Sequence, residues 1–338
     1  MSKSTKPKSI SQVVVIGTSA GGLKALIQLT SQLQSTFPAP ILVVQHISGD
    51  ASGSVMLDSL KENTKLKCEI AKNGTKLKAG YLYIAPPDHH LMVDTNHTVL
   101  VTKGAQENRW RPAIDPLFRS AAVNYASNAI GIVLTGYLDD GTAGLKAISR
   151  CGGICIVQLP ADAEYPDMPK NALNQVEADY CLPISEMGGL LYQLTDKPRG
   201  KSKAIPKDIL IEADIAKRVL SDLPAVNALG DQVPFNCPGC GGVLWQVDAG
   251  SSTRYRCHTG HAYTAASLLA EQTSKIEETM WVALRMFEER KNLLTTMSKD
   301  LTGAALKSSL ERAELSQVHI NRIKAILGGG TNKGMPDE

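Results

Sequence analysis

A serine, a histidine and two neighbouring aspartates each lie in a loop that directly follows an apolar run of the sequence. Ser19 lies in the glycine-rich string GTSAGG at residues 17–22, His46 follows a second apolar run, and Asp139 and Asp140 follow a third. A serine hydroxyl, an imidazole base and a carboxylate that orients the imidazole are the groups of a serine hydrolase. The pattern therefore predicts ester hydrolysis at Ser19 with His46 as the base. Residue chemistry alone does not choose between the two aspartates, because one of them could cap a helix or a turn.

The glycine-rich string also fits a dinucleotide-binding loop. Ser19, however, replaces the second glycine of G-x-G-x-x-G, and Gln45-His46 stands where such a site needs a carboxylate. These two mismatches favour the hydrolase. The string resembles the nucleophile elbow of α/β-hydrolases as well, but their order is serine, acid, histidine, and this chain has serine, histidine, aspartate. The order argues against an ordinary lipase or esterase.

A second group of residues has the spacing of a metal site. Cys237 and Cys240 form a Cys-x-x-Cys pair, and Cys257 and His261 follow after a gap of sixteen residues. Four such ligands suit tetrahedral zinc in a closed, structural site that leaves no position for an activated water. His258 is the alternative fourth ligand. The other four cysteines are expected to be small core residues: Cys68, Cys151, Cys155 and Cys181.

The elements that must position these groups alternate between strands and helices. Short β-branched runs predict strands buried on both faces, at residues 13–16, 41–44, 80–84, 130–134 and 154–157. Helical spacing follows at 23–33 and 116–125, and a turn signal at 94–96 predicts a hairpin strand at 97–102. The fold class is therefore α/β, a doubly wound and mostly parallel sheet, whose carboxyl edge would carry Ser19, His46 and the aspartates.

Composition divides the chain into six parts. The expected ranges are a flexible leader (1–11), a catalytic domain (12–194), a linker (195–232), a zinc-ribbon-like module (233–264), a helical hairpin (265–327) and a disordered tail (328–338). The linker prediction rests on the charged, proline-interrupted string DKPRGKSKAIPKD at 196–208. The hairpin is expected to break at 300–303 and either to bind a partner or itself, or only to pack on the zinc module.

Bulk properties exclude several classes of protein. The chain has 338 residues and a formal net charge of +3, with its lysines concentrated in leader and linker, which argues against a nucleic-acid partner. No apolar stretch approaches the roughly 20 residues of a membrane span, and the leader lacks a signal-peptide cleavage site. Seven cysteines, two of them in a Cys-x-x-Cys pair, favour a reducing cytoplasm and a metal site over disulfides.

Residues 12–194 resemble the catalytic domain of the chemotaxis-type protein-glutamate methylesterases, the CheB family. The motifs that carry the resemblance are VVVIGTSAGG, ILVVQHI, YLYIAPPDHHLMV, RWRPAIDPLFRSAA, GIVLTGYLDDGTAGL and MPKNAL. The resemblance implies Ser19 as nucleophile, His46 as base and Asp140 as acid, with Asp139 as a variable neighbour. It places Ala20, Gly21 and Tyr137 by the oxyanion hole and Arg111 near an acidic substrate segment, although Arg111 could equally be an exposed arginine at a helix start.

The resemblance implies hydrolysis of glutamate γ-methyl esters on methyl-accepting chemoreceptors or similar signalling proteins, together with deamidation of receptor glutamines, and it implies no cofactor for catalysis. The string FNCPGCGGVLWQV…YRCHTGHAYT resembles a tail found on some homologues without a receiver domain. About eleven residues precede the first predicted strand, so phosphorylation control in cis is expected to be absent. A separate regulator or methyltransferase, and through it a phosphorelay, would then be the partner.

Two departures from the family pattern keep alternative functions open. Ala20 stands where the family usually has threonine, and Tyr137-Leu138 stand where it has Met-Gly. The alternatives are a non-catalytic scaffold that keeps the hydrolase fold and an esterase with a substrate outside chemotaxis.

Overall fold

The computed structural model describes residues 12–47, 53–196, 203–218, 223–248 and 253–329. The predicted leader therefore lies outside the described residues, and so do residues 330–338, which make up most of the predicted tail. The chain divides into two compact units, with the boundary between Leu268 and Leu269. Within the described residues, no helix is both long and apolar enough to cross a bilayer.

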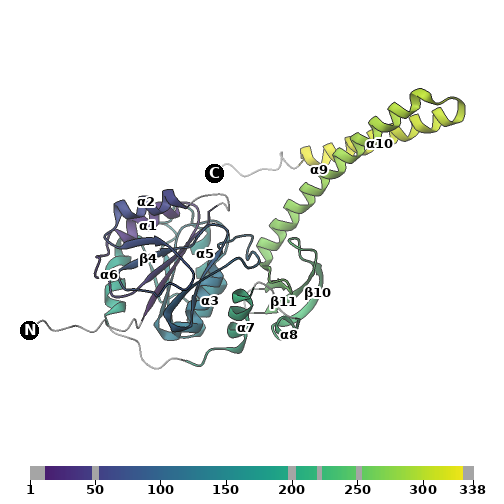
Figure 1. Cartoon of the computed structure of the whole chain (residues 1–338). Helices are drawn as coiled ribbons and strands as arrows, with labels where there is room; N and C mark the ends of the chain where they lie inside the picture. The colour runs from purple at the N-terminus through teal and green to yellow at the C-terminus, as the bar shows by residue number, and fades with distance from the viewer. Residues whose placement is uncertain (1–11, 48–52, 197–202, 219–222, 249–252, 330–338) are drawn as a thin grey trace, which may run out of the picture. The chain divides into compact units, whose positions relative to one another are not determined.

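The first unit is built on a sheet with helices around it (Figure 1). The sheet has seven parallel strands in the order β3-β4-β2-β1-β7-β8-β9. Its strands are β1 (Val13–Thr18), β2 (Ile41–Gln45), β3 (Lys67–Ile70), β4 (Tyr81–Ile84), β7 (Ala129–Val133), β8 (Ile154–Gln158) and β9 (Tyr180–Leu182). All five runs predicted as strands are strands of this sheet, so the α/β prediction is confirmed. Strands β3 and β9 were not predicted, because they lie at the two edges and lack a fully buried apolar run.

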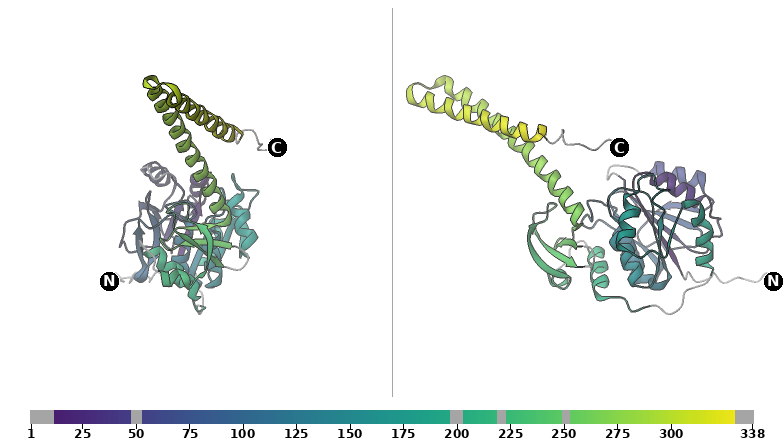
Figure 2. Two further views of the ribbon diagram at one scale, coloured as in Figure 1. Left: turned by 90° about the vertical axis from the view of Figure 1, so that its right-hand side faces the viewer. Right: turned by 180° about the vertical axis from the view of Figure 1, so that it is seen from behind.

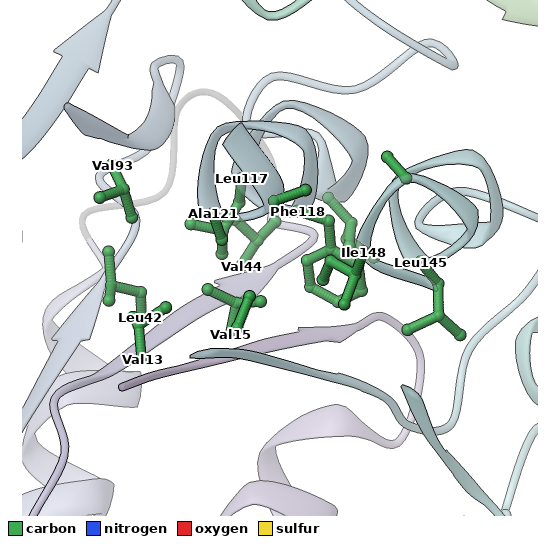
Figure 3. Packing of buried hydrophobic residues seen from close by; sticks show 14 of the residues in the cluster. Val13, Val15, Leu42, Val44, Val93, Leu117, Phe118, Ala121, Leu145 and Ile148 are labelled. Atoms are coloured by element: carbon green, nitrogen blue, oxygen red, sulfur yellow. The ribbon is translucent and has the colours of Figure 1, made fainter. Parts of the chain in front are cut away.

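Helices cover both faces of the sheet because successive side chains of each strand point to opposite sides. One layer contains α1 (Gly22–Thr30), α2 (Ser54–Asn63) and α6 (Ile184–Thr195), whose buried side chains belong to the same apolar core as Val14 and Ile16 of β1. The other contains α3 (Ile114–Tyr125), α4 (Thr142–Arg150) and α5 (Asp167–Gln175), whose buried side chains belong to the same apolar core as Val13 and Val15. Figure 3 shows this second layer, in which Val13, Val15, Leu42 and Val44 lie against Leu117, Phe118, Ala121, Leu145 and Ile148. Burying each large apolar side chain stabilises the fold by about 1.5–3 kcal/mol.

A small antiparallel pair packs against α3. It consists of β5 (His90–Asp94) and β6 (Thr98–Thr102), joined by the turn η1 (Thr95–His97). The hairpin strand predicted from the turn signal is confirmed. The loop between β6 and α3 is long, and it supplies several residues of the site described below.

The predicted linker at 195–232 is wrong over much of its length. It contains α7 (Lys207–Lys217) and α8 (Leu223–Asn227), and β10 begins at Gly230, three residues before the predicted module. Ile209 of α7 joins the core on the α3 side, and Glu212 is buried among arginines. The charged composition of the segment suggested that it is solvated. Instead, the buried ion pairs of Glu212 and the apolar contact of Ile209 fix α7 in place.

A four-stranded antiparallel sheet follows, in the order β10-β11-β12-β13: β10 (Gly230–Asn236), β11 (Val243–Asp248), β12 (Thr253–Cys257) and β13 (Ala262–Thr264). With the start of the next helix, residues 230–248 and 253–268 form what we call the four-stranded module. It lies in the first compact unit.

The second unit is a helical hairpin, and the predicted break is confirmed. α9 (Ala265–Met297) starts in the first unit and leads through η3 (Ser298–Asp300) to α10 (Gly303–Gly329). The two views of Figure 2 show the end of α9 and α10 running side by side. Their inner positions repeat at heptad spacing and are buried: Leu284 and Leu294 on α9, and Ser309, Ala313, Ser316 and Ile320 on α10. Since α10 reaches Gly329, the predicted tail starts two residues too early.

Candidate active site and metal cluster

Three neighbouring strands bring the serine, the histidine and the aspartates to one edge of the sheet. Ser19 follows β1, His46 follows β2 and Asp140 follows β7, and β1 lies between the other two strands. Because all three strands are parallel, their carboxyl ends meet at the same edge. The juxtaposition expected from the sequence is therefore present in the fold.

The ring of His46 lies between the serine and Asp140. Its Nδ1 is 3.2 Å from Ser19 Oγ, and its Nε2 is 2.7 Å from Asp140 Oδ2. One face of the ring stacks on Trp110, with centroids 4.3 Å apart and planes 8° from parallel. A proton on Nε2 directed at the carboxylate leaves Nδ1 free to accept the serine proton. Trp110 was not singled out from the sequence, because nothing local marks an aromatic residue as a histidine support.

Asp140 is buried and surrounded by hydrogen-bond donors. Ile114 N donates to Oδ2 over 2.7 Å, and Asn108 Nδ2 donates to Oδ1 over 3.0 Å. Burial by itself raises the pKa of Asp140, but the hydrogen bond and charge of His46, followed by these donors, hold that pKa below its ordinary value. The carboxylate is therefore charged and oriented toward His46.

Asp115 is a second buried carboxylate beside Asp140, and no local sequence pattern marks it. Its Oδ1 accepts hydrogen bonds from the backbone N–H groups of Gly141 and Gly144. It thus caps α4 from another helix, since the N-cap residue Gly141 has no side chain to do so. Burial, with Asp140 nearby, raises the pKa of Asp115 to about 7. Of the two carboxylates, Asp140 is the one that retains its charge most strongly.

Asp139 does not face the histidine. Its Oδ1 accepts a hydrogen bond of 3.1 Å from Thr264 Oγ1 in the four-stranded module. Burial raises its pKa, and the hydrogen bond from Thr264 opposes the increase. The geometry separates the two aspartates that residue chemistry left equivalent.

The loop after β1 offers backbone donors beside the serine. Ser19 N itself donates to Thr135 O over 3.0 Å, so the N–H groups of Ala20 and Gly21 at the start of α1 are the candidates for an oxyanion hole. Gly21 has a φ of 72°, which favours glycine at this position. A cavity of about 600 Å³ opens beside the serine, and its lining includes Leu23, Ile27, Lys24 and Glu164.

The loop after β7 contacts Ser19 from the other side. A Cβ on Gly136 would lie 2.2 Å from Met168 Sδ and 2.7 Å from Ser19 Cβ, so a side chain there would force these neighbours to shift. Tyr137 is 53% exposed and packs on Tyr165 with centroids 4.7 Å apart. Leu138 has a φ of 64°, a conformation that glycine adopts more cheaply, and its carbonyl accepts a 2.7 Å hydrogen bond from Asn171. The loop thus keeps the backbone shape that glycine would favour even though it carries leucine.

Arg111 is held by neighbouring residues. Its Nε and Nη2 donate to Asp88 Oδ1, over 2.8 and 2.5 Å, and its Nη1 donates to Gly104 O over 2.8 Å. The hydrogen bonds from Lys103 and Arg111 lower the pKa of Asp88 to about 2. A substrate carboxylate would have to compete with Asp88 for this guanidinium.

The four predicted metal ligands come together at one end of the four-stranded module. The ligand atoms of Cys237, Cys240, Cys257 and His261 all lie within 4.8 Å of one another. Cys240 Sγ is 3.7 Å from Cys257 Sγ, which in turn is 3.5 Å from His261 Nδ1. The sulfur separation is far longer than the disulfide bond of about 2.05 Å. It matches an edge of a tetrahedron with zinc–sulfur bonds of about 2.3 Å. The cluster is thus compatible with a metal, with His261 rather than His258 as its fourth member.

The chain matches the family model described as CheB methylesterase over residues 14–191. It is 36% identical over 183 residues to a putative protein-glutamate methylesterase/protein-glutamine glutaminase of Leptospira interrogans, covering 54% of this chain and 94% of that protein. It is 34% identical over 194 residues to the protein-glutamate methylesterase FrzG of Myxococcus xanthus, covering 57% and 58% of the two chains. The crystal structure of the Thermotoga maritima CheB methylesterase catalytic domain matches with a TM-score of 0.53 at 34% identity, covering 54% of this chain and 98% of that one.

Proposed function

Because the chain belongs to the CheB methylesterase family, we propose that Ser19, His46 and Asp140 are the catalytic triad with which it hydrolyses glutamate γ-methyl esters. The protein is a protein-glutamate methylesterase, a carboxylic ester hydrolase. The observation that carries the assignment of the triad is the continuous hydrogen-bonded chain from Ser19 Oγ through His46 to Asp140.

The proposed reaction has two halves. His46 Nδ1 takes the proton of Ser19 Oγ as that oxygen attacks the ester carbonyl, and the imidazolium then gives the proton to the departing methoxy group, which leaves as methanol. Water attacks the acyl-enzyme next, His46 removes its proton, and the same proton returns to Ser19 Oγ as glutamate is released. Asp140 holds the Nε2 proton in place and stabilises the imidazolium in both halves. These groups suffice without a cofactor.

Backbone groups would stabilise the oxyanion. The N–H groups of Ala20 and Gly21 support this role because they lie at the start of α1, where the helix dipole favours negative charge. Tyr137 would contribute through its backbone and line the entrance with its ring. For Arg111, the contacts with Asp88 and Gly104 favour a role in holding the loop that carries Trp110.

We place the ester on methylated chemoreceptors, and we propose deamidation of receptor glutamines by the same acyl-enzyme route, with ammonia as the leaving group. The names of the relatives in Leptospira and Myxococcus support the reaction class. A separate regulator or a methyltransferase, linked to a phosphorelay, is the proposed further partner. A cytoplasmic location is proposed because none of the seven cysteines forms a disulfide.

A methylated receptor fragment tests the function directly. Mass spectrometry of the fragment is expected to show loss of methyl groups with wild-type protein and no loss with Ser19→Ala, and a fluorophosphonate probe is expected to label Ser19 in wild type only. Labelling without demethylation would indicate a substrate outside chemotaxis. Failure of wild type to label would favour the non-catalytic scaffold.

For the four-stranded module we propose a structural zinc ion held by Cys237, Cys240, Cys257 and His261. When bound, the ion would supply cross-linking of two loops and no chemistry at the ester. We expect about one equivalent of zinc by elemental analysis, and a fall in the midpoint of thermal unfolding of the module when a strong chelator is added. Labelling of Ser19 by the fluorophosphonate probe, with and without chelator, is a second measurement. Less than half an equivalent in well-folded protein, with no response to chelator, would contradict the proposal.

A further inference from the structure

Asn108 connects the catalytic acid to the four-stranded module. Its side chain is 5% exposed, and its amide is bonded on both sides. The amide nitrogen donates to Asp140 Oδ1 and to Asp115 Oδ2, each over 3.0 Å. The amide oxygen accepts from Thr264 N over 3.1 Å and from Ser267 Oγ over 3.3 Å.

The module determines which way this amide points. The backbone N–H of Thr264 is a donor that cannot become an acceptor, so the oxygen of Asn108 must face it. The nitrogen must then face the two carboxylates, which are acceptors. The backbone adds a third constraint, because Asn108 N donates to Ala262 O over 2.8 Å. Two residues of the module, Thr264 and Ser267, thereby fix a donor on the catalytic acid.

Buried charges hold the module in register with the catalytic domain. Glu107, the residue before Asn108, pairs with Arg119 of α3 over 2.5 Å and with Arg256 of β12 over 3.1 Å. Arg254 of the same strand pairs with Glu212 of α7. All five side chains are buried. Sliding β12 by one residue would leave these charges unpaired, at a cost that favours a single docked arrangement.

The loop that carries the acid is contacted twice. Thr264 Oγ1 donates to Asp139, while Thr264 N, through Asn108, orients Asp140. The region matched by the family model ends at residue 191, before the module begins. The arrangement therefore goes beyond the triad and its reaction.

We propose that the four-stranded module is a built-in support of the active site and that Asn108 is the positioning residue through which it orients Asp140. The proposal rests on the function proposed above. According to this proposal, the four-stranded module affects the rate of the chemical step and does not affect substrate binding.

The test uses the full chain with Asn108→Leu, which keeps the approximate volume and removes both sets of hydrogen bonds, and Ser267→Ala, which removes the hydroxyl that contacts Asn108 Oδ1 and Thr264 O from the module side. Asn108→Leu is expected to lower kcat about 10- to 100-fold, because a hydrogen bond to a charged group is lost, with KM within about threefold. Ser267→Ala is expected to lower kcat about two- to fivefold. Both are expected to move the acidic limb of the kcat profile to higher pH, since an Asp140 with fewer donors attracts the His46 proton more strongly.

Ser316→Ala is the matched control. Ser316 is equally buried, but its hydroxyl bonds the Arg312 carbonyl of its own helix. It is expected to leave kcat and the pH profile unchanged. A Ser267→Ala variant that behaves like Ser316→Ala, or an Asn108→Leu variant that loses stability without a change in kcat or pH profile, would overturn the proposal.

A further measurement separates this proposal from the proposed function. If wild type does not demethylate receptors, the rate of fluorophosphonate labelling of Ser19 against pH replaces kcat. If Ser19 does not label either, the proton resonance of the His46 Nε2–H that faces Asp140 is compared between wild type, Ser267→Ala and Asn108→Leu. An unchanged resonance in both variants would contradict the positioning role.

Discussion

Replacing Asp140 by asparagine is expected to lower kcat for ester hydrolysis about 10⁴-fold. The asparagine side chain has nearly the same shape, and the donors from Ile114 and Asn108 surround this position from outside. Its amide nitrogen, however, would donate to His46 Nε2 and leave the proton on Nδ1. With that tautomer the ring cannot accept the proton of Ser19. The measurement is kcat on a methylated receptor fragment, with circular dichroism to verify folding.

Asp139→Asn is the matched control for this change. The Asp139 carboxylate accepts from the Thr264 hydroxyl and does not contact His46, so kcat is expected to remain within about threefold of wild type. Equal losses in the two variants would show that the acid has been wrongly assigned.

Glu107→Gln is expected to lower the free energy of unfolding by about 3–5 kcal/mol, because it leaves Arg119 and Arg256 without their carboxylate. Glu212 alone would then remain near three buried arginines, at positions 119, 254 and 256. Urea titration followed by tryptophan fluorescence gives the measurement. Glu289→Gln breaks an exposed pair with Arg285 and is the control, with an expected loss below about 1 kcal/mol. Similar small losses at both positions would mean that the buried network does not hold the module.

The same carboxylate gives the pH dependence of stability. Burial raises the pKa of Glu107, but Arg119 and Arg256 outweigh burial and lower it to about 2, from an ordinary value of 4.5. A group whose pKa is lower in the folded state stabilises the fold above its unfolded pKa, and this contribution is lost as pH falls through its folded pKa. Wild type is therefore expected to lose stability between about pH 4.5 and 2, and Glu107→Gln is expected to lose less in that window. Parallel curves for the two proteins would contradict the role of this charge.

Sequence patterns were enough to predict which edge of the sheet carries Ser19, His46 and the aspartates, and which cysteines and histidine cluster together. Continuous apolar runs mark buried parallel strands, so the loops that follow them share one edge, and Ser19, His46 and the aspartates lie there. The four residues of the cysteine and histidine cluster can also be recognised in the sequence. They form two close pairs, and a short turn sets the spacing within each pair. The helical hairpin and its break followed from periodicity and one turn signal. Each of these features is marked by a local pattern: an apolar run, a close pair of ligands or a helical periodicity.

The way in which Asp140, the proposed catalytic acid, is held follows from tertiary contacts and not from the local sequence. Asp140 and Asp139 are adjacent in sequence and differ only in which neighbour each faces, His46 or Thr264. In the sequence, Asn108 looks like an ordinary polar residue of a long loop, and Glu212 looks like part of a charged linker. Both are buried because residues of the four-stranded module, more than forty positions away in the chain, supply the donors and charges that satisfy them. Local patterns carry no information on such pairings, since burying a polar group is favourable only when its distant partner is in place.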